Sequence, residues 1–189
     1  MNDFNFIIPL RKDAGDITGI ASTSSVDRDD ERMSEKALAD MIDGIKREGI
    51  NLFGNHEHNW ENTLGVVKDA NLSGSQVLVK IGLDDPITNP KVPMLLNKLK
   101  RGIKLGLSVG GNVKSFKWEY DKAVGKKIKV LDSVEIYEVS VVGIPSNKDS
   151  FLTIPQAIAK SARLPELKKC FNCNTKTEKE NCPICLTKL

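Results

Sequence analysis

The sequence predicts a mostly β protein of the α+β class, a closed or nearly closed β-barrel with peripheral helices. One observation is a series of short apolar segments, roughly seven to nine of them, separated by turn-forming residues, which is typical of sandwiches and barrels. A second is that other segments repeat apolar residues with the period of a helix. With 189 residues, 40% of them hydrophobic, the chain is large enough for one such domain and an appendage.

The individual elements follow from alternation, helical spacing and turn residues along the chain. We expect strands over residues 4–10, 17–22, 50–58, 64–69, 76–82, 102–111, 115–120, 126–130 and 134–142, and helices over 33–47, 92–101 and 151–162. Ser34 is a suitable N-cap for the first helix, and Gly49 ends it. We divide the chain into a barrel domain (residues 1–150), a helix or linker (151–167) and a cysteine-containing tail (168–189).

The predicted strand at residues 102–111 is the most informative. Apolar residues occupy one of its faces and small or charged residues the other: Ile103, Leu105, Leu107 and Val109 against Lys104, Gly106, Ser108 and Gly110. Glycines flank Ser108 on its own face, so we expect an open trench beside the hydroxyl that a backbone or ligand can approach closely. The alternative is a glycine-rich edge strand in which the serine is incidental.

Both histidines of the chain, His56 and His58, lie at the end of one predicted strand, where residues two apart point the same way. A nucleophilic serine needs such a base, and the base needs a third group that holds its tautomer. Glu138 is the candidate because it lies in a strongly apolar strand, where an ionised carboxylate needs a partner. Glu135, on the opposite face of that strand, is the substitute.

The same residues leave other interpretations open. The histidines fit a polar strand end, or a metal site completed by Glu57 or Asp85. We favour catalysis, because Ser108, a histidine and Glu138 together supply the three roles of a catalytic triad.

Four groups of short motifs follow one another along residues 1–150. They cover residues 19–22 with 26–28 and 37–38, residues 52–56 with 64–67, residues 102–103 with 106–110, and residues 137–142 with 145–147. In this order and spacing the motifs resemble those of the prohead maturation proteases of tailed bacteriophages, which share a fold with the herpesvirus assemblins. The resemblance implies the fold of the herpesvirus protease for the barrel.

The resemblance also implies a serine endopeptidase that needs no cofactor for catalysis. By position, His56 matches the family's histidine, Ser108 its serine, and Glu138 the acidic residue of its last motif. Family members commonly have an acidic residue soon after the histidine. Glu57 fills that place here and His58 follows it, so either histidine can be the base. We prefer His56.

The resemblance further implies where the protein acts and on what. We expect it inside assembling proheads, in the host cytoplasm, with capsid and scaffold precursor proteins as partners. Self-cleavage and homo-oligomerisation stay open. The donors that stabilise the oxyanion are not readable from side chains, but Gly110 and Gly111 follow the serine and can present backbone N–H groups.

The four cysteines form a separate motif at the end of the chain. Cys170, Cys173, Cys182 and Cys185 follow the pattern C-x2-C-x8-C-x2-C. Four thiolates in two tight turns suit tetrahedral Zn²⁺ and leave no open position, so we expect a structural, zinc-ribbon-like unit. Iron in a rubredoxin-like site and four unligated thiols are the alternatives. The resemblance to the proteases does not cover this tail.

Composition and charge exclude some classes of protein. The net charge of +3 is small and gives no argument for nucleic-acid binding by the barrel. The charge is uneven, because residues 151–189 carry +4, so the tail is the part suited to nucleic acid or protein docking. We expect neither a membrane span nor a signal peptide, because no apolar run is long enough. Clustered cysteines favour a reducing compartment over a secreted disulfide framework.

A second function of a different class fits the same sequence. The barrel would be a catalytically inactive capsid-assembly or scaffold-binding module, and its zinc tail would dock protein or nucleic acid. The substitution Ser108→Ala separates the two, because it abolishes proteolysis in the first case and leaves binding intact in the second.

Overall fold

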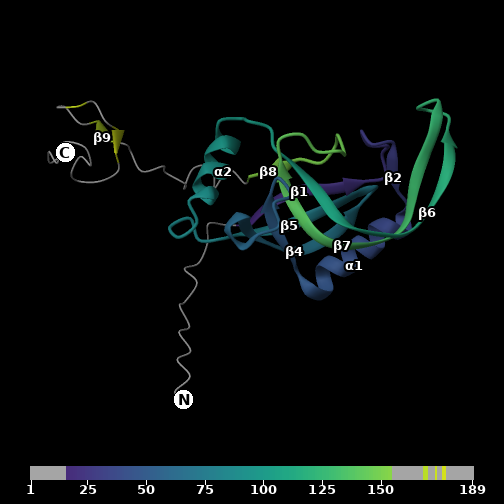
Figure 1. The fold of residues 1–189 in the computed structure, drawn as a ribbon, viewed down its shortest axis with the longest axis horizontal. Helices are drawn as coiled ribbons and strands as arrows, with labels where there is room; N and C mark the ends of the chain where they lie inside the picture. Colours follow the sequence, from purple (N-terminus) through teal and green to yellow (C-terminus); the bar gives the residue numbers. More distant parts are fainter. Residues whose placement is uncertain (1–15, 155–167, 170–172, 174–175, 178–189) are drawn as a thin grey trace, which may run out of the picture.

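The computed structural model describes residues 16–154, 168–169, 173 and 176–177. The elements before the tail are β1 (Asp16–Thr23), β2 (Glu31–Met33), α1 (Glu35–Glu48), β3 (Ile50–Gly54), the 3₁₀ helix η1 (Trp60–Asn62), β4 (Thr63–Ser73), β5 (Gln76–Leu83), α2 (Lys91–Lys100), β6 (Gly106–Asp121), β7 (Lys126–Val142) and β8 (Leu152–Thr153). The expected mostly β fold with a few helices is confirmed (Figure 1).

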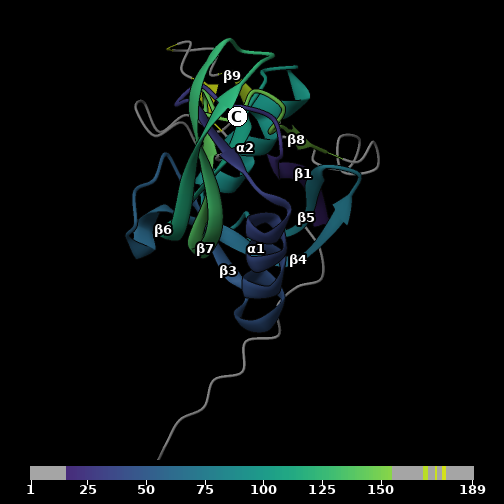
Figure 2. The ribbon, with the colours of Figure 1, turned by 90° about the vertical axis from the view of Figure 1, so that its right-hand side faces the viewer.

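The eight strands form one curled sheet. Its order is β2-β7-β3-β4-β5-β1-β8, and β6 pairs with β7 beside this path. Among the described residues no ladder joins β6 to β1 or β8, so the sheet is a curled half-barrel, more open than the closed or nearly closed barrel that the sequence suggested (Figure 2). The opening lies along the free edge of β6, the strand that carries Ser108.

Helix α1 covers one face of the sheet, where it contacts β4 and β7. Ser34 caps it as predicted, with its Oγ accepting a hydrogen bond from the N–H of Ala37 at 3.1 Å, and Gly49 ends it at φ +66°. Its buried side chains recur at helical spacing: Ala37, Leu38, Met41 and Ile45. Asp40 accepts hydrogen bonds from Ser133 Oγ at 2.6 Å and from the N–H of Val134, which ties α1 to the middle of β7. These bonds lower the pKa of the Asp40 carboxyl below its ordinary value, the bond from Ser133 most of all.

Strands β6 and β7 are longer than the sequence indicated. Four short strands were expected between residues 102 and 142, but residues 102–105 lie outside the sheet and the rest forms two continuous strands joined at residues 122–125. Register shifts follow Gly110, Val113 and Ser115, and each inserts a β-bulge where the alternation of side chains breaks. The far part of this hairpin extends beyond the rest of the sheet (Figure 1).

Two short strands were missed. Residues 31–33 form β2 and pair in parallel with β7, although Met33 was expected to begin the first helix. Residues 152–153, expected in a helix, form β8 and pair with β1 at Thr18 and Gly19. Residues 155–162 of that expected helix and the strand expected at residues 4–10 lie outside the described residues. No helix in the described ranges has the length and apolar character that a membrane crossing needs.

In the tail, β9 (Lys168–Lys169) pairs with β10 (Lys176–Thr177) in antiparallel register. Three of the four predicted zinc ligands, Cys170, Cys182 and Cys185, lie outside the described residues. The zinc-ribbon-like unit therefore stays a prediction.

Candidate active site

Glu138 occupies the middle of β7 and is 2% exposed. Gly110 faces it from β6 in the register of the two strands. A Cβ atom on Gly110 would lie 2.3 Å from Glu138 Oε1, so any larger residue at this position would have to displace the carboxylate. At Gly106, the second glycine beside Ser108, a Cβ would meet the ring of Pro145 and a backbone carbonyl oxygen. Protein atoms thus fill the space at the Cβ positions of these two glycines, so the glycines do not form the trench as predicted, and the open space beside Ser108 is a cavity that other residues also line.

The turn after β3 brings His56 to this carboxylate. The expected strand over residues 50–58 ends at Gly54, and Asn55 and His56 both adopt left-handed backbone, with φ of +53° and +59°. Such φ values are uncommon for residues other than glycine and are held by surrounding contacts. Here the N–H of Asn55 donates to the Val141 carbonyl at 2.9 Å, and the N–H of His56 donates to Ser140 Oγ at 3.2 Å. Both contacts fold the chain back over β7.

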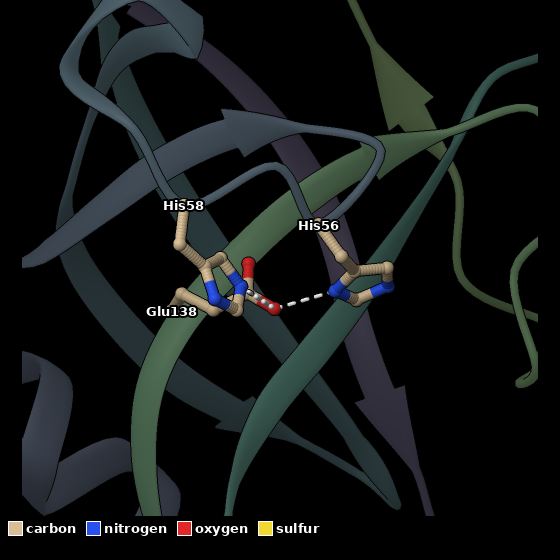
Figure 3. Close-up of side chains that lie close together, drawn as sticks. All are labelled: His56, His58 and Glu138. Carbon is tan, nitrogen blue, oxygen red and sulfur yellow. Dashed lines mark hydrogen bonds and ion pairs between the residues drawn. The ribbon is translucent and has the colours of Figure 1, made fainter.

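The imidazole of His56 pairs directly with Glu138. The distance between Nδ1 and Oε1 is 2.5 Å (Figure 3). An ionised carboxylate can only accept, so in a neutral ring this bond needs the proton on Nδ1 and leaves the lone pair on Nε2. The Glu138 side chain is 3% exposed and that of His56 41%, so a buried carboxyl group orients a ring that reaches the surface.

His58 approaches the same oxygen from the other side. Its Nε2 lies 3.4 Å from Glu138 Oε1, and Figure 3 shows the carboxylate between the two rings. The His58 side chain is 58% exposed. The histidines converge because of the turn, and not because an extended strand points both to one face as predicted.

The acidic residues considered as alternatives lie elsewhere. Glu57 accepts a hydrogen bond from Asn62 Nδ2, and Asp85 from the N–H of Ile87. Glu135 pairs with Lys114 at 3.2 Å. Of the acidic residues named from the sequence, Glu138 is therefore the one that both histidines meet.

Ser108 lies on β6 directly opposite Ser140. Opposed residues of antiparallel strands have Cα atoms about 4.5–5.5 Å apart and side chains on the same face. This register places Ser108 next to the network of Ser140, Glu138 and His56. No hydrogen bond joins Ser108 to His56 among the described residues, and catalytic hydrogen bonds often tighten only when substrate binds.

A cavity of about 280 Å³ adjoins Ser108 at the opening of the half-barrel. Residues 107–113 of β6 form one wall, and β1 and the loop after it form another. Among the described strands β6 pairs with β7 alone, so alternate backbone N–H groups along this stretch point away from β7 and make no ladder bond to another described strand.

Ser140 is the site residue to which sequence reasoning assigned no role. It is fully buried, donates to Glu138 Oε2 at 2.6 Å and accepts from the N–H of His56, so it joins the carboxylate to the turn. The available signal was a hydroxyl in a run of valines, two residues after the buried glutamate on the same face.

Two other stretches in the motif pattern support the cavity wall. Asp27 accepts hydrogen bonds from the N–H groups of Asp29 and Glu31, while burial raises the pKa of its carboxyl above the ordinary value. The guanidinium group of Arg28 donates a hydrogen bond to the backbone carbonyl of Pro145. The backbone N–H of Arg28 donates to the backbone carbonyl of Ser146. Residues 26–28 and 145–147, far apart in sequence, thus hold each other in place.

Comparisons with known proteins identify the family of the chain and proteins of related fold. The chain is 26% identical over 144 residues to the prohead protease of Escherichia phage T5, covering 75% of this chain and 63% of that protein. Its fold resembles the capsid assembly protease of bacteriophage T4, with a TM-score of 0.54 at 15% identity over 67% of this chain and 80% of the other. For a protease of Kaposi's sarcoma-associated herpesvirus the TM-score is 0.47 at 9% identity, and the match covers 72% of this chain and 63% of that protease. The model of the caudovirus prohead serine protease family matches residues 15–163. The chain belongs to this family.

Proposed function

We propose that the protein is a serine endopeptidase of phage head maturation that cleaves scaffold or capsid precursor proteins during prohead assembly. The observation that carries the proposal is the bond between His56 and buried Glu138, next to Ser108 on the adjoining strand. Family membership supports it. So do the names of the relatives, a prohead protease in phage T5 and a capsid assembly protease in phage T4.

In the proposed mechanism Ser108 is the nucleophile and His56 the base. Ser108 Oγ attacks the scissile carbonyl carbon while its proton passes to His56 Nε2. Glu138 keeps the Nδ1 proton in place and stabilises the imidazolium. The C–N bond then breaks, and the amine leaves with the proton from Nε2. Water, activated by the same nitrogen, hydrolyses the acyl ester and restores the Ser108 hydroxyl.

Backbone N–H groups at the free edge of β6 are the proposed oxyanion donors. Gly110 and Gly111 follow Ser108 in the cavity wall, and the register of β6 with β7 shifts between them, with Tyr137 of β7 as the extra residue. The substrate backbone would lie along this edge, with the scissile carbonyl next to Ser108.

The proposal is tested by incubating the purified chain with scaffold and capsid precursor proteins from its own phage. The wild-type chain is expected to cut them, and Ser108→Ala is expected to bind them without cutting. If the wild-type chain and Ser108→Ala both bound the precursors and neither cut them, the chain would be an inactive assembly module. We place the enzyme inside the assembling prohead in the host cytoplasm, and the same experiment reports self-cleavage.

For the tail we propose one structural Zn²⁺ held by Cys170, Cys173, Cys182 and Cys185. The antiparallel pairing of β9 with β10, on either side of the first cysteine pair in sequence, supports a compact unit. When bound, the metal supplies folding energy to this unit and has no step in catalysis.

We predict that metal analysis finds one zinc per chain and that Cys182→Ser releases it without unfolding the sheet. A chain cut after Ile154 should still cleave a small peptide. The cut must lie there because Leu152 and Ser150 are buried, and β8 completes the sheet beside β1. Absence of zinc, or loss of small-peptide cleavage in the shortened chain, would contradict the division between domain and tail.

A further inference from the structure

We propose that His56, His58 and Glu138 form a reversible inhibitory site for Zn²⁺. The inference rests on the proposed protease function, in which His56 and Glu138 have roles and His58 has none. Ligand atoms of the three side chains all lie within 4.8 Å of one another. Two imidazoles and one carboxylate are a ligand set that zinc commonly takes in proteins.

The geometry is close to that of a zinc site. With Zn–N and Zn–O bonds of about 2.0–2.2 Å, ligand atoms at a tetrahedral metal lie about 3.3–3.6 Å apart. The distance from His58 Nε2 to Glu138 Oε1 is 3.4 Å and already fits. The distance from His56 Nδ1 to the same oxygen is 2.5 Å, so this ring must move back by about 1 Å. A ring on an exposed turn can make that shift.

The surroundings favour a metal at this point. Ser140 holds the other carboxylate oxygen of Glu138, which fixes Oε1 toward the two rings. The rings are 41% and 58% exposed, so an ion can enter from solvent, and a fourth position stays open to water. A cation there would also neutralise a carboxylate that is buried on β7.

Metal binding would remove the base without touching the nucleophile. Zinc on His56 Nδ1 takes the lone pair of that nitrogen, so the proton of the neutral ring must reside on Nε2. A protonated Nε2 cannot accept the proton of Ser108. As zinc binds, the Nδ1–H bond breaks and its proton passes to water, while Nε2 takes a proton from water, so the ring stays neutral. Removal of zinc reverses both transfers and restores the pair with Glu138.

The activity test uses peptide cleavage by the full chain at increasing zinc concentration, with each rate expressed relative to the metal-free rate of the same variant. Loss of a second-shell contact commonly costs about 10–100-fold in metal affinity, so His58→Gln, which loses a ligand, should need at least about 100-fold more zinc for half-inhibition. Glu57→Gln is the matched control in the same turn and should keep wild-type sensitivity. Chelation should reverse inhibition, and Mg²⁺ should not inhibit because it prefers oxygen ligands. Equal sensitivity of wild type and His58→Gln, or no inhibition of wild type, would overturn the proposal.

Calorimetry separates this proposal from the protease function. The single variant Ser108→Ala should bind one more Zn²⁺ per chain than the double variant Ser108→Ala/His58→Gln. This difference is expected whether or not the protein has peptidase activity. All variants share the four cysteines, so zinc in the tail cancels in the comparison. Identical stoichiometry in the two variants would exclude the site even if the chain proves to be a protease.

Discussion

Replacing Ser108 with alanine is expected to lower kcat for peptide cleavage by about 10⁶-fold, the scale seen when a triad serine or histidine is removed. Replacing His56 with alanine should cost about as much, and the double replacement little more, because the two groups act as one unit. Glu138→Gln should cost less, about 10⁴-fold, because the serine and the base remain while the tautomer is lost. The measurement is single-turnover cleavage of a peptide taken from a precursor junction.

Glu57→Gln is the control for this series. It lies in the same turn as His56, and its carboxylate contacts Asn62 and not the triad, so its rate should match wild type. Wild-type cleavage by Ser108→Ala would end the serine protease account. Activity retained in His56→Ala but lost in His58→Ala would move the base by two residues.

Gly110→Ala is expected to lower kcat for peptide cleavage by about 100-fold, although it adds only one methyl group and does not alter the nucleophile. The new Cβ would lie 2.3 Å from Glu138 Oε1, so the carboxylate must move, and a displacement of about 1 Å at a catalytic group costs on this scale. Overpacking of this kind also costs about 1–3 kcal/mol of stability, which denaturant unfolding would measure.

Gly143→Ala is the matched control, because a Cβ there meets no atom within 4 Å. Its rate and its unfolding midpoint should stay close to those of wild type. If Gly110→Ala kept full activity while Glu138→Gln lost it, the close packing of Gly110 on the carboxylate would have no part in catalysis.

The sequence was informative where local pattern decides the structure. Ser34 and Gly49 bound α1 as predicted, because capping is a property of neighbouring residues. The sequence also singled out Ser108, His56 and Glu138, which the structure places on adjoining elements. Their catalytic roles stay predictions.

The sequence was less informative where residues far apart in the chain determine the local structure. The left-handed turn at Asn55 and His56 depends on hydrogen bonds to β7, more than 80 residues away, and no local pattern encodes it. The space at Gly110 was misjudged for the same reason, because the atoms of Glu138 that fill it come from another strand. The length of β6 and β7 was missed because β-bulges interrupt the alternation from which strands are predicted.

The most direct test of the central claim is covalent labelling with a peptidyl phosphonate, a reagent that reacts with an activated serine, followed by peptide mass spectrometry. We predict one adduct per chain, on Ser108, formed by wild type and Glu57→Gln and lost in His56→Ala. Ser140, buried and bonded to Glu138, should stay unlabelled and serves as the internal control. An adduct on another serine, or peptide cleavage that continues with Ser108 unlabelled, would contradict the assignment of Ser108 as the nucleophile.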